Sequence, residues 1–228
     1  MADVLAAFVR VVAFTVAALL PIINPVGGAP IFLTTTPGAS DATRRAMARR
    51  VATNSLILLV SAMLVGSYVL LFFGLSLAVV KIAGGLLVLS TGWQLLRAES
   101  SPDARLATTS AIPALDDRHL MTRAFYPLTF PLTVGPGSLS VALTLGATTR
   151  VQGATPLTSV LGTALGLVIV VVTIYVCYRF ATTLLSKLGD TGTVVMLRLS
   201  AFILVAIGVQ IFCDGVIEEF HIPIPRRF

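Results

Sequence analysis

The chain has 228 residues, of which 56% are hydrophobic and only 11% are charged, and its formal net charge is +6 at pH 7. Soluble domains carry about 25% charged residues, so this composition excludes an ordinary soluble domain and predicts an all-α polytopic membrane protein. The positive charge does not indicate a nucleic-acid partner, because the basic residues cluster between apolar runs, as in DATRRAMARR. There they act as topology signals and as contacts for anionic lipid in the bilayer.

Hydropathy predicts six transmembrane helices, at about residues 4–33, 51–73, 75–96, 124–145, 156–180 and 194–211. The longest connection has mixed charge and two prolines, which is typical of a polar loop that divides a chain. We therefore expect four parts: a first three-helix repeat at 1–96, a polar cytoplasmic loop at 97–123, a second, inverted three-helix repeat at 124–213, and a short polar tail at 214–228.

The distribution of lysine and arginine predicts the orientation of these spans. Ten basic residues fall on one side: Arg44, Arg45, Arg49, Arg50, the four arginines of the long loop, Arg179 and Lys187. Four fall on the other side, namely Arg10, Arg150, Arg226 and Arg227. Because cytoplasmic loops carry the excess of basic residues, both termini are expected outside.

Two pairs of segments match between the halves. AFTVAALLPIINPVGG can be aligned with AFYPLTFPLTVGPGS, which pairs Pro25 with Pro136, and VVKIAGGLLVL with VMLRLSAFILV at an offset of one residue, which pairs Lys81 with Arg198. Three spans per half place the second half upside down relative to the first. The two matches therefore predict an inverted repeat, a common architecture of transporters.

The first and fourth spans are predicted to be broken, because each contains a cluster of proline and glycine. Irregular backbone is tolerated in a membrane where it lines a cavity, and the N-termini of half-helices bind anionic groups there. A plain proline kink or a re-entrant packing element is the alternative. The candidate substrate-binding residues are Asn24, Pro25, Gly27, Gly28, Thr133, Gly135, Pro136, Gly137 and Ser138.

Lys81 and Arg198 are predicted to lie inside the third and sixth spans. Intramembrane charges usually face the bundle interior and mark a pathway, but these two could also snorkel to the interface or satisfy the carbonyls of a broken helix. No Asp or Glu occurs well inside a span. That pattern argues against a carboxylate proton relay and favours a substrate that bears a carboxylate or a phosphate.

No catalytic or metal-binding constellation is evident. His119 and His221 have no Cys, Asp or Glu at ligand spacing, and Cys177 and Cys213 are expected at opposite faces of the membrane. We therefore expect no enzymatic activity, no metal and no cofactor.

The segments LLPIINPVGGAPIFL, KIAGGLLVL, PLTFPLTVGPGSLS and RLSAFILVAIGVQIFCDG resemble the MarC family (UPF0056) of integral membrane proteins. The resemblance implies six spans in a bacterial inner membrane and transport of small neutral amino acids such as glycine or alanine. The family's first-break positions would be Asn24, Pro25, Gly27 and Pro30, and the second-break positions Pro131, Thr133, Gly135, Pro136 and Gly137. Lys81 stands where relatives are expected to have arginine.

The leading functional hypothesis is a secondary transporter that holds the carboxylate of a small neutral amino acid at broken-helix N-termini near the midplane. A proton or a sodium ion would be the coupling ion, and a homo-oligomer is left open. The alternatives are an exporter or channel for another small solute and a non-transporting membrane scaffold or regulatory protein.

Overall fold

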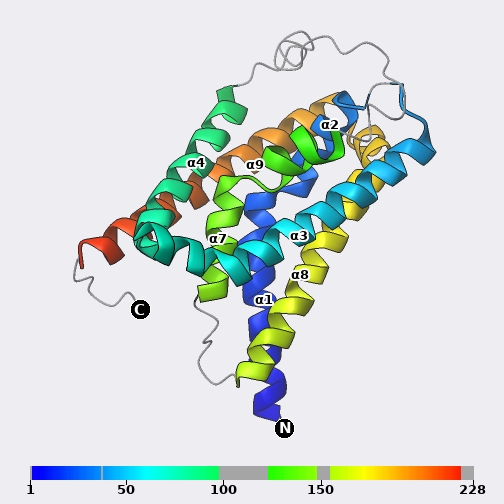
Figure 1. Ribbon diagram of the computed structural model, residues 1–228. Helices are drawn as coiled ribbons and strands as arrows, with labels where there is room; N and C mark the ends of the chain where they lie inside the picture. Colours follow the sequence, from blue (N-terminus) through cyan, green and yellow to red (C-terminus); the bar gives the residue numbers. More distant parts are fainter. Residues whose placement is uncertain (1, 37, 98–122, 148–154, 222–228) are drawn as a thin grey trace.

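The computed structural model describes residues 2–36, 38–97, 123–147 and 155–221 (Figure 1). All regular structure in these ranges is helical. Five helices are long and apolar enough to cross a membrane, and a pair of helices bent by 70° gives a sixth span when it is counted as one. The prediction of an all-α polytopic membrane protein is confirmed.

The first half contains α1 (Ala2–Ile23), α2 (Pro25–Thr34), α3 (Asp41–Phe73) and α4 (Leu77–Arg97). Helix α3 begins ten residues before the predicted second span and includes the basic segment DATRRAMARR. The hydroxyl of Ser40 accepts a hydrogen bond from the Thr43 N–H at 3.1 Å and so caps α3 ahead of that segment. Gly74, with a φ of 66°, ends the helix.

The second half contains η1 (Ala124–Thr133), α7 (Pro136–Ala147), α8 (Pro156–Arg179) and α9 (Ala181–Glu219). Gly189, with a φ of 65°, interrupts α9, and the apolar span follows at Thr191–Glu219. Helix α9 therefore continues six residues into the segment predicted to be a polar tail. The interior of the predicted loop at 97–123 lies outside the described residues.

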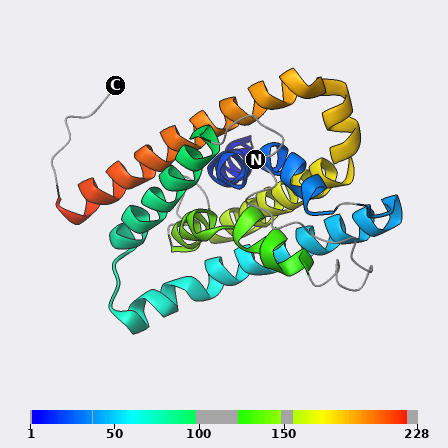
Figure 2. The ribbon, with the colours of Figure 1, turned by 90° about the horizontal axis from the view of Figure 1, so that it is seen from above.

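The helices surround α1, which Figure 2 shows end-on near the middle of the molecule. Helix α1 packs mainly on α8, α3 packs on α7 and α8, and α4 packs along α9. The buried core includes Leu19, Phe32, Met47, Leu128 and Ile174. Many large apolar side chains remain exposed on the outside of the helices, as expected for a surface that faces lipid.

The contacts of the two halves correspond. Helix α3 contacts η1 and α7 of the second half, and its counterpart α8 contacts α1 and α2 of the first. Likewise α4 contacts α7, and α9 contacts α2. The predicted inverted repeat requires this correspondence, although the repeat itself stays a prediction.

Candidate functional site

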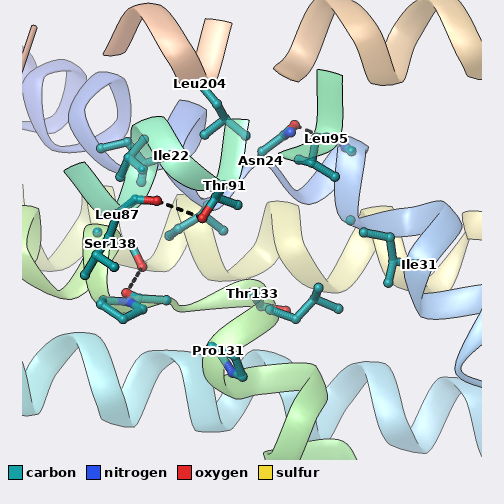
Figure 3. Close-up of a pocket in the computed structure, with 18 residues that line it drawn as sticks. Ile22, Asn24, Ile31, Leu87, Thr91, Leu95, Pro131, Thr133, Ser138 and Leu204 are labelled. Atoms are coloured by element: carbon teal, nitrogen blue, oxygen red, sulfur yellow. Dashed lines mark hydrogen bonds between the residues drawn. The ribbon is translucent and has the colours of Figure 1, made fainter. Parts of the chain in front are cut away.

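The two broken spans meet at one cavity of about 270 Å³ between α2, α4, η1 and α7 (Figure 3). Asn24 and Thr91 lie on one side of it, and Thr133 and Ser138 approach from the other. The residues that line the cavity are Ile22, Ile23, Asn24, Gly27, Gly28, Ile31, Leu87, Val88, Thr91, Leu95, Pro131, Leu132, Thr133, Gly135, Pro136, Gly137, Ser138 and Leu204. None of them carries a charged side chain.

The first break is a single residue, Asn24, in the left-handed conformation at φ 45° and ψ 58°. Its N–H donates to the Leu20 carbonyl and its carbonyl accepts from the Gly28 N–H, both at 2.9 Å. Its side-chain Oδ1 accepts from the Gly27 N–H at 3.1 Å, while Pro25 at the first position of α2 has no N–H to satisfy. The Asn24 Nδ2 donates to no described residue, so this amide is available to a ligand.

The second break is larger. Tyr126 and Phe130 have extended rather than helical backbone angles, and the bonds Tyr126–Pro127 and Phe130–Pro131 are cis. The chain then bends by 70° between η1 and α7. The two breaks thus differ in extent, with one residue at the first and a longer irregular segment at the second.

The bend leaves both N–H groups and carbonyl groups of the backbone without a partner in the wall of the cavity. The N–H groups of Gly137 and Ser138 donate to no described residue, and the carbonyls of Pro131 and Leu132 accept from none. Ser138 itself is held at the start of α7, where its Oγ donates to the Gly135 carbonyl at 2.9 Å. The cavity therefore offers hydrogen-bond donors at a helix N-terminus and acceptors nearby.

Tyr178 on α8 connects the two breaks. Its hydroxyl lies 2.8 Å from Thr133 Oγ1, whose own bond to the Leu128 carbonyl is 2.6 Å long. Its ring stacks on Phe32 of α2 at 4.9 Å, and the side chain is 1% exposed. Since Thr133 Oγ1 donates to Leu128, the Tyr178 hydroxyl donates to Thr133.

Eight of the nine predicted binding residues line the cavity, and the exception is Pro25, which is buried as the first residue of α2. Sequence reasoning missed Tyr178 and the wall from α4, which consists of Leu87, Val88, Thr91 and Leu95. These four residues share one face of a helix, so their spacing could have identified a common surface but not what it faces.

Lys81 and Arg198 do not line this cavity. The Lys81 ammonium, near the start of α4, forms an ion pair with the Glu218 carboxylate of α9. Arg198 is exposed on α9. Neither cation is therefore placed to contact a ligand held between the two breaks.

Comparison with known proteins gives one consistent result. The family profile described as MarC family integral membrane protein matches residues 9–220. The UPF0056 inner membrane protein MarC of Escherichia coli O1:K1 / APEC is 31% identical over 206 residues, which cover 88% of this chain and 91% of that protein. The UPF0056 membrane protein MJ1677 of Methanocaldococcus jannaschii is 30% identical over 198 residues, covering 87% and 92%.

The UPF0056 membrane protein YvbG of Bacillus subtilis is 26% identical over 204 residues, which cover 90% of this chain and 93% of that protein. No solved structure shows significant similarity. The relatives match nearly their whole length, so the two breaks and all of the cavity lie within the shared region.

Proposed function

The chain belongs to the MarC family of integral membrane proteins, and we propose that it is a secondary transporter of small neutral amino acids of the glycine or alanine type. The observation that carries this proposal is the convergence of both broken helices on a single cavity. Discontinuous helices that meet near the middle of a membrane protein are a recurrent way to bind a substrate in transporters.

The unpartnered backbone groups of the second break match the two charges of an amino acid. The N–H groups of Gly137 and Ser138 open α7 and would hold the carboxylate, helped by the positive end of the helix dipole. The carbonyls of Pro131 and Leu132 would accept from the ammonium. The free Asn24 amide adds one further donor from the opposite side of the cavity.

The size and wall of the cavity favour a small substrate without net charge. A volume of about 270 Å³ lies just below the range of roughly 300–1,000 Å³ that is typical of pockets for drug-sized ligands. Leu87, Val88 and Leu204 form an apolar wall that leaves little room for a long side chain. With no charged side chain in the lining, a substrate with net charge would be buried without a counter-charge.

We propose the inner membrane as the location, in line with the names of relatives such as the inner membrane protein MarC of E. coli, with both termini outside. A proton or sodium gradient would drive transport, and a homo-oligomer remains compatible with the proposal.

The test is uptake and efflux of labelled glycine and alanine in proteoliposomes of the purified protein under proton or sodium gradients. Leu87→Trp places a larger side chain in the wall of the cavity, where Leu87 is 47% exposed, and is expected to abolish transport. Leu86→Trp is the matched control, because Leu86 is the neighbouring residue, is 48% exposed and does not line the cavity. Absence of transport by the wild type under every gradient would contradict the proposal, and unchanged transport by Leu87→Trp would contradict the site.

An exporter or channel for another small solute is the second candidate, and the largely apolar wall of the cavity favours it. A thermal-shift screen of small solutes distinguishes the two candidates. Stabilisation of the wild type but not of Leu87→Trp by a solute other than an amino acid would support the second candidate.

A further inference from the structure

A second cavity, of about 320 Å³, lies between α1, α4, α7 and α9. Its lining residues come from the second half of α1, the start of α4, the middle of α7 and the last third of α9. Its lining consists of Phe14, Ala17, Ala18, Ile22, Lys81, Ser140, Val141, Thr144, Leu145, Ile207, Ile211 and Asp214. Ile22 also lines the cavity between the breaks, so the two cavities have this residue in common.

Unlike the first cavity, the second carries one cation and one anion. The Lys81 ammonium has three N–H donors, and Glu218 is its carboxylate partner. Asp214 accepts a 2.7 Å hydrogen bond from Gln210 Nε2, which leaves most acceptor positions of its carboxylate unused. Both charged groups therefore retain capacity for a ligand.

The two hydroxyls in the wall already donate to backbone carbonyls. Ser140 Oγ donates to the Val80 carbonyl, and Thr144 Oγ1 donates to the Ser140 carbonyl, both at 2.9 Å. The side chains of Lys81 and Asp214 are therefore the main source of polar contacts for a ligand in this cavity.

The packing of α9 on α4 holds the two charges near each other. A Cβ atom at Gly215 would lie 2.8 Å from the Ile82 nitrogen and 2.9 Å from the Ala78 carbonyl oxygen, so the two backbones touch beside Asp214 and Lys81. An ion pair between Lys81 and Glu218 alone would be explained by anchoring at the membrane interface. Asp214, one turn before Glu218 on α9, does not take part in that pair and instead lines the cavity.

We propose that the second cavity is an access site that binds an α-amino acid zwitterion before it passes Ile22. The substrate carboxylate contacts the Lys81 ammonium and the substrate ammonium contacts the Asp214 carboxylate. This inference rests on the proposed function, and it adds a second binding site to the cavity between the breaks. Lys81 and Asp214 lie near one end of the apolar spans Leu77–Arg97 and Thr191–Glu219, and ionisable groups within spans usually mark substrate pathways.

The experiment measures binding of labelled alanine to the full chain in detergent by equilibrium dialysis, so it does not depend on transport. The wild type is expected to bind two molecules per chain, and Leu87→Trp one. In the Leu87→Trp background, Lys81→Gln and Asp214→Asn should each weaken the remaining site about tenfold or more, because each removes a charged hydrogen bond. The conservative variants Lys81→Arg and Asp214→Glu should retain binding.

Lys187→Gln and Glu219→Gln are the matched controls, since they make the same charge changes at exposed residues outside both cavities. Both controls should bind as their parent does. On the Leu87→Trp protein, propionate and alaninamide, which each lack one charge of alanine, should compete about tenfold less well than alanine. This competition needs no charge variant and so does not depend on how those variants fold.

Absence of alanine binding by Leu87→Trp would overturn the access site, even if the wild type transports alanine. Equal binding by the charge variants and their controls would also overturn it. Lys81-dependent and Asp214-dependent binding without any transport would support the access site and count against the proposed function only.

Discussion

At the scale of single residues, Gly28 of α2 lies directly against Tyr178, whose hydroxyl contacts Thr133 of the second break. A Cβ atom at Gly28 would lie 2.5 Å from the Tyr178 hydroxyl oxygen and 3.3 Å from the nearest ring carbons. The Tyr178 ring is buried against Phe32 and its hydroxyl is bonded to Thr133, so it has no free space into which to move. Gly28 is therefore required for close approach rather than for its backbone angles.

We predict that Gly28→Ala abolishes transport and that adding Tyr178→Phe restores part of it. Phenylalanine lacks the oxygen that the new methyl group would meet but keeps the ring stacked on Phe32. Tyr178→Phe alone loses the hydrogen bond to Thr133 and should lower the free energy of unfolding by about 1 kcal/mol. Thermal unfolding and uptake measure both effects, with Tyr175→Phe on the same helix as the control. Equal activity of Gly28→Ala and the double variant would refute the steric explanation.

Asn24 has a backbone role at the first break and a ligand role in the proposed site, and two substitutions separate them. Asn24→Gly keeps easy access to the left-handed conformation, so this variant should fold. Because the substitution removes the side-chain amide, the variant should transport poorly. Asn24→Ala should be less stable than Asn24→Gly by about 1–2 kcal/mol, the cost of a Cβ in that conformation. Thermal unfolding midpoints give the order of stability. If Asn24→Gly transports like the wild type, the amide does not contact the substrate.

At the scale of helices, α4 and α9 touch through glycine. A Cβ atom at Gly208 would lie 2.5 Å from the Leu89 nitrogen, and one at Gly85 would lie 2.5 Å from the Phe212 nitrogen. In each case the obstacle is backbone, which cannot rotate away. Small residues allow such close helix approach in membranes, where dispersion contacts and not the hydrophobic effect hold helices together.

We predict that Gly208→Ala destabilises the protein by about 1–3 kcal/mol through overpacking. Gly192→Ala on the same helix should be nearly neutral, because its Cβ would meet only the Leu188 side chain, at 3.3 Å. The midpoint of thermal unfolding in detergent compares them. Similar midpoints for the two variants would show that the α4–α9 contact is looser than the structure has it.

The positions of the membrane spans and their breaks could be predicted from the sequence, whereas the residues that pack around the cavity could be predicted only in part. Apolar runs locate the spans because lipid demands about 20 apolar residues, and proline with glycine locates the breaks because they interrupt helical hydrogen bonding. Eight of the nine residues predicted from the breaks line the cavity. The α4 wall and Tyr178 could not be predicted, because a residue that faces a cavity and one that faces lipid can be equally apolar.

The start of α3 was missed for a related reason. Hydropathy stops at charged residues, whereas Ser40 caps a helix that continues through the arginines.

At the scale of the whole molecule, the C-terminal ends of the helices α2, α4 and α8 lie on one side, and the start of α1 and the end of α9 lie on the other (Figure 1). This arrangement agrees with the predicted topology but does not say which side is cytoplasmic. Only the distribution of lysine and arginine predicts that the termini are outside.

Cysteine labelling in intact cells tests the orientation. With Cys177 and Cys213 replaced by serine, Leu75→Cys should react with a membrane-impermeant maleimide, because Leu75 lies on the side of the termini and is 47% exposed. Ala42→Cys, at the exposed start of α3, should react only after the membrane is permeabilised. The reverse pattern would show that the protein has the opposite orientation.

The uncharged wall of the cavity between the breaks has an electrical consequence. Moving one elementary charge across 100 mV is worth about 2.3 kcal/mol, but a zwitterion in a lining without charged side chains carries no net charge across the field. The membrane potential therefore does no net work on the movement of such a substrate in this cavity. Any current that accompanies transport would have to be carried by the coupling ion. The charge that crosses the membrane per substrate molecule would then give the number of coupling ions, and the direction of the current would give the direction of their movement.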